Sequence, residues 1–282
     1  MTELGGALLA MAIGVIGTSV IHLSKGFMRL GISNRSSKVY AIGVAMNFTN
    51  PLWVILANRF APTVFYTSMY GLGLIPLLLF SRYQLNEQLH RRQYRGIAII
   101  VLGTLIVGFG NLLGGKPSLY GANQALLIAV AGFWLIGAPL FSVLVRRVRV
   151  SIQEYFFGIT AGGMAALEAL VKGFAQAGPT GSTFLPQTTV GWWLFGVSFL
   201  GAAGAFGMIQ WSYLRSCRAS MMGSLYDVSY VTIPLLLSAV LVDGAGLGVW
   251  SVLGIACLVA GVLETTRGGS DVETKPAVQS QI

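Results

Sequence analysis

The chain contains long apolar runs that recur along almost its whole length. Each run has about 18 to 23 residues, and at a rise of 1.5 Å per residue such a helix crosses a hydrocarbon core of about 30 Å. A β-barrel would instead show alternating segments of about ten residues. The sequence therefore predicts an all-α polytopic membrane protein with about nine transmembrane helices. The expected spans are 4–23, 39–58, 62–81, 96–114, 124–145, 153–176, 191–213, 219–241 and 247–265.

Composition supports the same class. Apolar residues make up 55% of the chain and charged residues only 10%, whereas soluble domains carry about 25% charged residues. No interval between the runs is long enough for a separate globular domain. Residues 266–282 are polar and are expected to form a disordered cytoplasmic tail.

The net charge of +9 is distributed very unevenly. When successive loops are assigned to alternate sides, fifteen of the eighteen basic residues fall on one side, and only Arg59, Lys116 and Lys172 fall on the other. Basic residues accumulate on the cytoplasmic side of membrane proteins. The pattern predicts an inner or plasma membrane protein with an external N-terminus and a cytoplasmic C-terminus. The charge thus reflects topology, and we expect no nucleic-acid partner.

Two parts of the chain are similar to each other. An offset of 158 residues maps "IPLLL" at 75–79 onto 233–237 and "GIA" at 96–98 onto 254–256, and an offset of 147 maps "KGF" at 25–27 onto 172–174. The alternation of loops gives the paired helices opposite orientations. We interpret this as two inverted repeats of four and five helices, residues 1–114 and 124–265. Chance similarity between apolar helices is the alternative. Inverted repeats are typical of secondary transporters.

The section 47–110, from "NFTNPLW" to "LIVGFG", resembles an EamA-type repeat of the drug/metabolite transporter superfamily. It has a helix ending near "AP", a proline-interrupted helix, the acidic turn "LNEQL" and a helix that begins with glycine. The nine-helix count and "KGF" are similar to the NIPA-like magnesium-transporter branch. Asp243 near the place of Glu87, and nine helices where ten are usual, depart from the pattern. The resemblance implies secondary transport of a small solute, or of magnesium.

Asp227 lies eight residues into its apolar run, about 12 Å from the expected cytoplasmic end. A charged side chain at this depth costs roughly 3 kcal/mol or more. Tyr230 and Pro234 follow on the same helical face, and Pro234 frees the carbonyl of Tyr230. We predict that Asp227 is the proton or coupling-ion site. The alternative is a structural carboxyl held by Ser224, Ser229 or a neighbouring helix.

Glu168 is the second candidate for a proton or coupling-ion site. Lys172 follows one turn later, and an ion pair with this lysine, extending towards the outer interface, is the structural alternative. We expect no bound metal. In the alternative magnesium function, Asp227 and Glu168 would be the ligands.

Further polar and aromatic residues are expected to line the substrate path, and two prolines are expected to act as hinges. The tryptophans have packing as their alternative role. The two histidines, His22 and His90, are expected to be solvated at the membrane interface, and Glu87 is expected to pair with Arg91 or Arg92. The predicted path residues are Asn47, Asn50, Trp53, Gln210, Trp211 and Tyr230, and the predicted hinges are Pro76 and Pro234.

Motifs for catalysis are missing from the sequence. It contains no phosphate-binding GxxxxGK[ST] loop, no HExxH and no plausible Ser/His/Asp set, so we expect neither an enzyme nor a cofactor. The prediction is a secondary transporter that moves a small solute by alternating access with proton or ion coupling. A divalent-cation transporter and a non-transporting scaffold or receptor are the alternatives. The expected partners are the substrate, the lipid bilayer and, as an option, a second copy in a homodimer.

Overall fold

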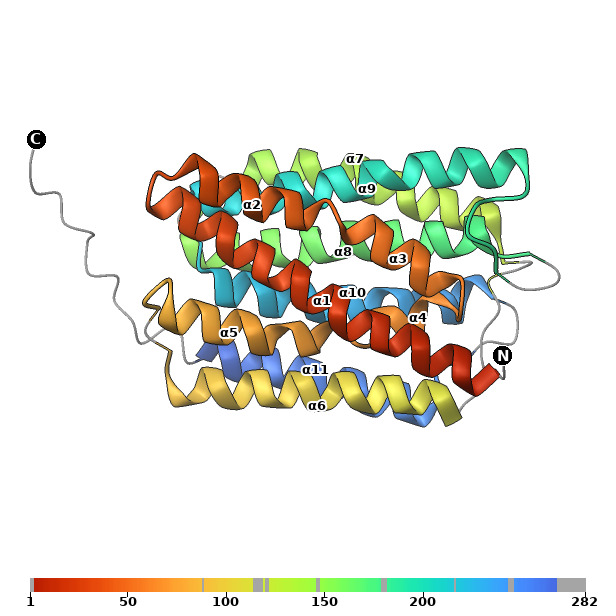
Figure 1. The fold of residues 1–282 in the computed structure, drawn as a ribbon, viewed down its shortest axis with the longest axis horizontal. Coiled ribbons are helices and arrows are strands. Elements are labelled where there is room, and N and C mark those ends of the chain that lie inside the picture. Colours follow the sequence, from red (N-terminus) through yellow and green to blue (C-terminus); the bar gives the residue numbers. More distant parts are fainter. Residues whose placement is uncertain are drawn as a thin grey trace, which may run out of the picture.

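The computed structural model describes residues 3–87, 89–113, 119, 122–145, 148–178, 182–215, 217–242 and 246–267. This part of the chain is helical and contains no strand, and its long helices lie side by side along one direction (Figure 1). The elements are α1 (Glu3–Ser33), α2 (Ser37–Asn47), α3 (Asn50–Asn58), α4 (Thr63–Thr67), η1 (Tyr70–Gly73), α5 (Leu74–Tyr83), α6 (Arg91–Leu113), α7 (Gln124–Val145), α8 (Val150–Gln176), α9 (Thr189–Leu214), α10 (Ala219–Leu241) and α11 (Val249–Arg267).

Seven helical segments are long and apolar enough to cross a membrane, which confirms an all-α polytopic membrane protein. The segment Val249–Thr265 of α11 is apolar but shorter. The 27-residue α8 is not among the seven, and it carries Glu154, Glu168 and Lys172. The seven segments are Leu4–Ser33, Ser37–Asn58, Thr63–Tyr83, Arg91–Leu113, Gln124–Val145, Thr189–Leu214 and Met221–Leu241.

The polar character of α8 follows from its place in the bundle. Every residue from 160 to 173 is buried, and so is every residue from 221 to 227 of α10. By contrast, α7 buries only Leu127, Ala138 and Ser142. Surrounding helices separate α8 and α10 from lipid, so these two helices can carry ionisable side chains that a lipid-facing helix could not.

Two predicted spans are interrupted near their middle. The span 39–58 is divided into α2 and α3, because Pro51, in the first turn of α3, has no amide hydrogen to donate to the carbonyl of Asn47. The span 62–81 is divided into α4, the 3₁₀ turn η1 and α5, and Pro76 lies in the first turn of α5. The span 219–241 remains one helix although Pro234 lies inside it. Pro51 and Pro76 therefore lie beside a helix break, whereas Pro234 lies inside a continuous helix.

The ends of α1 and α8 correct the sequence-based count of loop charges. Helix α1 continues to Ser33, ten residues beyond the predicted span, so Lys25 lies within the helix and is 2% exposed. Lys172 is completely buried in α8. Neither lysine is a loop residue, and the remaining basic residues still favour the same side. The predicted tail falls largely outside the described residues.

Helices α6 and α11 pack closely through glycines on both helices. A Cβ on Gly103 would lie 2.9 Å from the carbonyl oxygen of Gly254, and a Cβ on Gly96 would lie 2.6 Å from that of Gly261. Gly96 faces Gly261 and the later Gly103 faces the earlier Gly254, so the two helices are antiparallel. Small residues allow this close backbone approach within a membrane.

Candidate functional site

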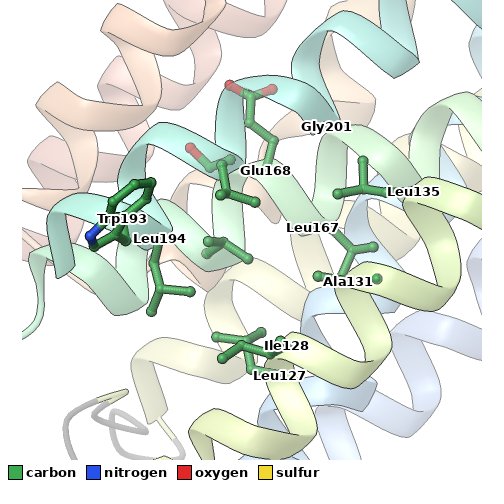
Figure 2. A pocket seen from close by; sticks show the side chains of 13 residues that line it. Leu127, Ile128, Ala131, Leu135, Leu167, Glu168, Trp193, Leu194 and Gly201 are labelled. Carbon is green, nitrogen blue, oxygen red and sulfur yellow. The ribbon is translucent and has the colours of Figure 1, made fainter. Parts of the chain in front are cut away.

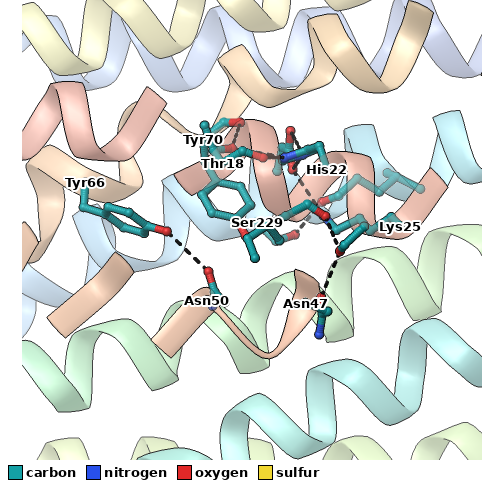
Figure 3. A network of polar contacts seen from close by, with 12 residues as sticks. Thr18, His22, Lys25, Asn47, Asn50, Tyr66, Tyr70 and Ser229 are labelled. Atoms are coloured by element: carbon teal, nitrogen blue, oxygen red, sulfur yellow. Dashed lines mark hydrogen bonds and ion pairs between the residues drawn. The ribbon is translucent and has the colours of Figure 1, made fainter. Parts of the chain in front are cut away.

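Polar side chains from both halves of the chain meet in the middle of the bundle. Thr18, His22 and Lys25 form a stripe along one face of α1, because their spacings of four and three residues return to the same side of a helix. They face Asp227 of α10 and the ring of Tyr70 in η1 (Figure 3). We call Thr18, His22, Lys25, Tyr70, Tyr226, Asp227 and Tyr230 the central cluster. Each of these residues is at most 4% exposed.

His22 and Asp227 form the contact that joins the two halves. The Nε2 atom of His22 lies 2.7 Å from Oδ1 and 2.8 Å from Oδ2 of Asp227, although 205 residues separate them in sequence. The other ring nitrogen, Nδ1, lies 2.7 Å from the carbonyl oxygen of Thr18. The Thr18 hydroxyl donates to the carbonyl of Tyr70 at 2.8 Å, so its oxygen also faces Nδ1 as an acceptor.

These partners allow the pair to exist with different numbers of protons. The geometry is satisfied by an imidazolium beside an ionised Asp227, or by a neutral imidazole that accepts from a protonated carboxyl. It is also satisfied by a neutral imidazole whose Nε2–H donates to Asp227 while Nδ1 accepts from the Thr18 hydroxyl, which then turns away from Tyr70. The last arrangement contains one proton fewer than the first two, so the pair is a candidate proton site.

Lys25 is bound to its surroundings by charge and by aromatic rings. Its Nζ lies 3.9 Å from Oδ1 of Asp227, 3.5 Å from the ring centre of Tyr226 and 5.6 Å from that of Tyr70. Contacts of this kind hold a buried ammonium in position. Its Nζ nevertheless has no hydrogen-bond partner among the described residues, and the same is true of the hydroxyl of Tyr230.

A glycine in the interrupted span allows η1 to approach α1. A Cβ on Gly73 would lie 2.5 Å from Oγ1 of Thr18 and would collide with the ring of His22. Only glycine therefore fits at this position while His22 reaches Asp227. The break between α4 and α5 thus lies directly against the central cluster.

The sequence identified Asp227 but not its main partner. The hydrogen-bonding partner is a side chain of a neighbouring helix, His22, whereas the hydroxyl of Ser229 donates to the carbonyl of Leu225. The prediction that His22 is solvated at the interface is wrong, because the side chain is completely buried. The spacing of Thr18, His22 and Lys25 was the signal that could have identified it.

The predicted path residues on α2 and α3 lie beside the central cluster or on its border. Asn50 is buried and accepts a hydrogen bond from the hydroxyl of Tyr66 at 3.3 Å (Figure 3). Asn47, on the other side of the α2–α3 break, accepts from Ser24 at 3.4 Å. The indole of Trp53 donates to Thr49 at 3.0 Å and is partly exposed.

The two predicted path residues on α9 have other surroundings. Gln210 accepts a hydrogen bond from the hydroxyl of Tyr40 at 3.0 Å and borders a surface pocket of about 300 Å³ with Arg35. Trp211 packs against the ring of Phe157, with 5.7 Å between ring centres. For Trp211 the observed contact is packing, the alternative given above. Neither residue contacts the central cluster in the described structure.

Glu168 forms the ion pair with Lys172 that was its structural alternative, but neither side chain reaches the interface. The ammonium of Lys172 also lies 4.1 Å from the ring centre of Phe199. Glu168 borders an apolar cavity of about 310 Å³ between α7, α8 and α9. In Figure 2 its carboxylate points away from Leu127 and Ile128 at the far wall of this cavity. The acid is therefore neutralised by its own helix.

One end of the bundle is joined across the halves by amide side chains. The Nδ2 atom of Asn58 donates to Oε1 of Gln176 at 3.1 Å, and Thr63 donates to Oδ1 of Asn58 at 3.0 Å. The amide nitrogen of Gln176 faces the carbonyl oxygens of Ile55 and Thr183 at 3.3 and 3.0 Å. We call these residues the Gln176 cluster. It connects α3 and α4 to the end of α8.

The opposite end is joined by charged groups. Arg218, just before α10, donates to both carboxylate oxygens of Glu154 at 3.1 and 2.9 Å, and its backbone N–H donates to Oε1 at 2.9 Å. This bond raises the pKa of the Arg218 guanidinium above its usual value. Glu87, expected to pair with Arg91 or Arg92, accepts from the backbone N–H of Ala219 at 3.3 Å. We call Glu87, Glu154, Arg218 and Ala219 the Glu154 cluster.

Candidate metal ligands do not gather in groups of three or more His, Cys, Asp or Glu residues within the described ranges. The structure thus defines a polytopic membrane protein with a buried His22–Asp227 pair at its centre. Comparison with protein-family models, curated proteins and solved structures finds no match. The similarity to drug/metabolite transporters therefore stays a prediction from the sequence.

Proposed function

We propose that this protein is a proton-coupled secondary transporter that moves a small solute by alternating access. The observation that carries the proposal is the buried His22–Asp227 pair, an acid and a base in hydrogen-bond contact between α1 and α10. Ionisable residues inside a membrane protein are costly and mark proton relays or substrate pathways. A static scaffold would gain nothing from such a pair that apolar packing could not supply.

The interrupted helices support the same function. Transporter sites are typically built beside discontinuous helices near the middle of the membrane. Here the α2–α3 break lies at Asn47 and Asn50, and the α4–α5 break supplies Tyr70 and Gly73 to the central cluster. Irregular backbone is tolerated at this depth only where protein or a water-filled path surrounds it.

Helix boundaries support the inverted repeat of four and five helices. The helices α5 and α10 end at Tyr83 and Leu241, 158 residues apart, and the starts of α6 and α11 have the same separation. The 158-residue offset also converts the Gly96–Gly261 contact into the Gly254–Gly103 contact. A pair of contacts related in this way is expected where two equivalent halves meet about a two-fold axis.

A divalent-cation transporter fits the contacts less well. Such a cation needs several free oxygen ligands. The carboxylate of Asp227 already faces His22 and Lys25, and that of Glu168 is paired with Lys172. A cation would have to displace these partners. We therefore prefer proton coupling to the magnesium alternative.

The proposal is tested in proteoliposomes that contain a pH-sensitive dye. Organic acids, amino acids, sugars, phosphate and magnesium salts are added outside in turn. We expect at least one organic solute to acidify the interior, and we expect Asp227→Asn to abolish this response, because an amide cannot exchange the proton with His22.

Glu264→Gln is the matched control, since it removes an acid that forms an ion pair with the exposed Arg95 at the end of the bundle. It should transport like the wild type. Undiminished acidification by Asp227→Asn would show that the pair does not couple transport. If no solute acidified the interior, and none exchanged with the same solute loaded inside the vesicles, the transporter proposal itself would be wrong.

A further inference from the structure

We infer that the transported solute is a small oxyanion, a carboxylate or a phosphate, bound by Lys25 and Tyr230 in the central cluster. This inference rests on the proposed function and names the substrate class of the same site. It follows from the balance of charges and of hydrogen-bonding groups among the buried residues.

The charges of the central cluster do not cancel when the His22–Asp227 pair holds the proton that the proposed function requires. Two basic side chains, His22 and Lys25, then face the single carboxylate of Asp227. In that state the cluster carries one net positive charge, on side chains that are at most 4% exposed. An uncompensated buried charge is costly, and a bound anion would remove it.

The hydrogen-bond donors also exceed the acceptors. Asp227 directs both oxygens at His22 and lies 3.9 Å from Lys25, beyond hydrogen-bond distance. The three N–H groups of Lys25 and the hydroxyl of Tyr230 are left without partners in the described structure. An oxyanion offers several acceptor lone pairs and no need for further donors. A cation would instead compete with Lys25 for the only carboxylate.

The aromatic rings place the two groups together. The ammonium of Lys25 lies over the ring of Tyr226, which is stacked with Tyr230 at 5.8 Å between ring centres. Tyr70 packs against Tyr230 at 3.9 Å and also lies near the ammonium. The rings thus fix a positive group and a hydroxyl on one aromatic stack. This arrangement suits one charged end of a small molecule.

Binding is tested without any gradient, by thermal unfolding of the purified full-length protein. The probes are sodium salts of mono- and dicarboxylates and of phosphate, with magnesium chloride, choline chloride and a neutral sugar as the other classes. We expect at least one oxyanion to raise the unfolding temperature, and the carboxylate and phosphate arms decide between these two chemistries. The inference is overturned if only magnesium or choline raises the unfolding temperature, or if none of the oxyanions does.

Two variants test the named residues. Lys25→Met should weaken oxyanion binding at least about tenfold, and Tyr230→Phe should weaken it roughly threefold to tenfold. Tyr230→Phe removes a hydroxyl that is unpaired in the described structure, so the protein should fold and be at least as stable as the wild type. Lys38→Met, which removes an exposed lysine on α2, should bind normally. Unchanged affinity in both Lys25→Met and Tyr230→Phe overturns the assignment.

The two proposals fail in different ways. An oxyanion-dependent shift that is lost in Lys25→Met, combined with no transport in proteoliposomes, would remove the transporter function and leave the anion site. Proton-coupled uptake of a cationic solute would support the transporter function and contradict the anion site.

Discussion

Two buried lysines occupy matching places in the chain but have different partners. Lys25 and Lys172 begin the two "KGF" motifs, and both ammonium groups lie against aromatic rings. Lys172 is paired with Glu168 one turn earlier on its own helix, whereas Lys25 faces Asp227 of another helix. An ion pair within one helix can persist through any movement of helices. The contact of Lys25 with Asp227 can change when α1 and α10 separate.

Cys217 gives a prediction at the scale of one residue. Burial raises the pKa of its thiol to about 12, and the carboxylate of Glu154 adds to the shift. A free cysteine titrates near pH 8.5, and the thiolate is the reactive form. We therefore expect maleimide to label Cys217 at mildly alkaline pH at least about a hundredfold more slowly than an ordinary cysteine.

The labelling is measured in a Cys257→Ser background, so that Cys217 is the single thiol. The comparison is a protein without native cysteines that carries Tyr83→Cys, because Tyr83 is 68% exposed. The raised pKa of Cys217 also determines how the stability of the protein changes with pH. Unfolded chains lose the thiol proton near pH 8.5 and the native protein keeps it, so this residue reduces stability as the pH rises above that value. Equal labelling rates for the two thiols would contradict the buried environment.

At the scale of elements, α6 and α11 are packed through their backbones. Because a Cβ on Gly103 would lie 2.9 Å from both the Cβ of Cys257 and the carbonyl oxygen of Gly254, larger side chains must separate the helices. We predict that Gly103→Ile lowers the free energy of unfolding by about 1–3 kcal/mol or more, measured by denaturation in detergent. Gly137→Ile on α7 is the matched control, since a Cβ there has no neighbour within 4 Å.

The inverted repeat extends this prediction. Under the 158-residue offset, Gly261 is the counterpart of Gly103, and its Cβ would lie 2.7 Å from the carbonyl oxygen of Gly96. Gly261→Ile should therefore destabilise the protein by a similar amount. A neutral result at Gly261 beside a large effect at Gly103 would show that the helix pair is not organised about a two-fold axis.

At the scale of the whole molecule, polar contacts lie at both ends of the bundle and in its middle. The Gln176 cluster joins one end, the Glu154 cluster joins the other, and the His22–Asp227 pair joins the middle. The central cluster is buried between two closed ends. Under the proposed function, such an arrangement would correspond to an occluded state of an alternating-access cycle, in which one end opens at a time.

Weakening one end should open it selectively. In a protein without native cysteines, the reporter Ser229→Cys lies next to the centre (Figure 3). We expect Asn58→Ala to increase its labelling by a membrane-impermeant thiol reagent from the Gln176 side, because Oε1 of Gln176 loses the donor on α3. We expect Glu154→Gln to increase labelling from the other side, because Arg218 loses a charged acceptor.

The control for both is Glu264→Gln, which lies outside the two end clusters. The magnitude expected for each end is severalfold, which corresponds to about 1 kcal/mol of lost hydrogen bonding. If each variant increased labelling equally from both sides, the substitutions would merely loosen the fold, and the end clusters would not act as separate closures.

Local features of the sequence determined the class of fold. The apolar runs required membrane-spanning helices, because only helices satisfy their own backbone hydrogen bonds in lipid. The sequence also identified Asp227 as exceptional, since a carboxylate inside an apolar run is costly wherever the helix lies. The ion pair of Glu168 with Lys172 was predictable as well, because the spacing of four residues places both on one helical face.

Only the tertiary structure decided what surrounds Asp227. His22 is 205 residues away, and helical periodicity carries no information about which helix lies opposite which. The predicted span ended at residue 23 and left Lys25 in a loop, whereas α1 continues for ten more residues and includes it. Its burial depends on Tyr70 and Tyr226, which come from two other elements. The sequence by itself determined the helices, and only their packing decided which charged groups meet at the centre.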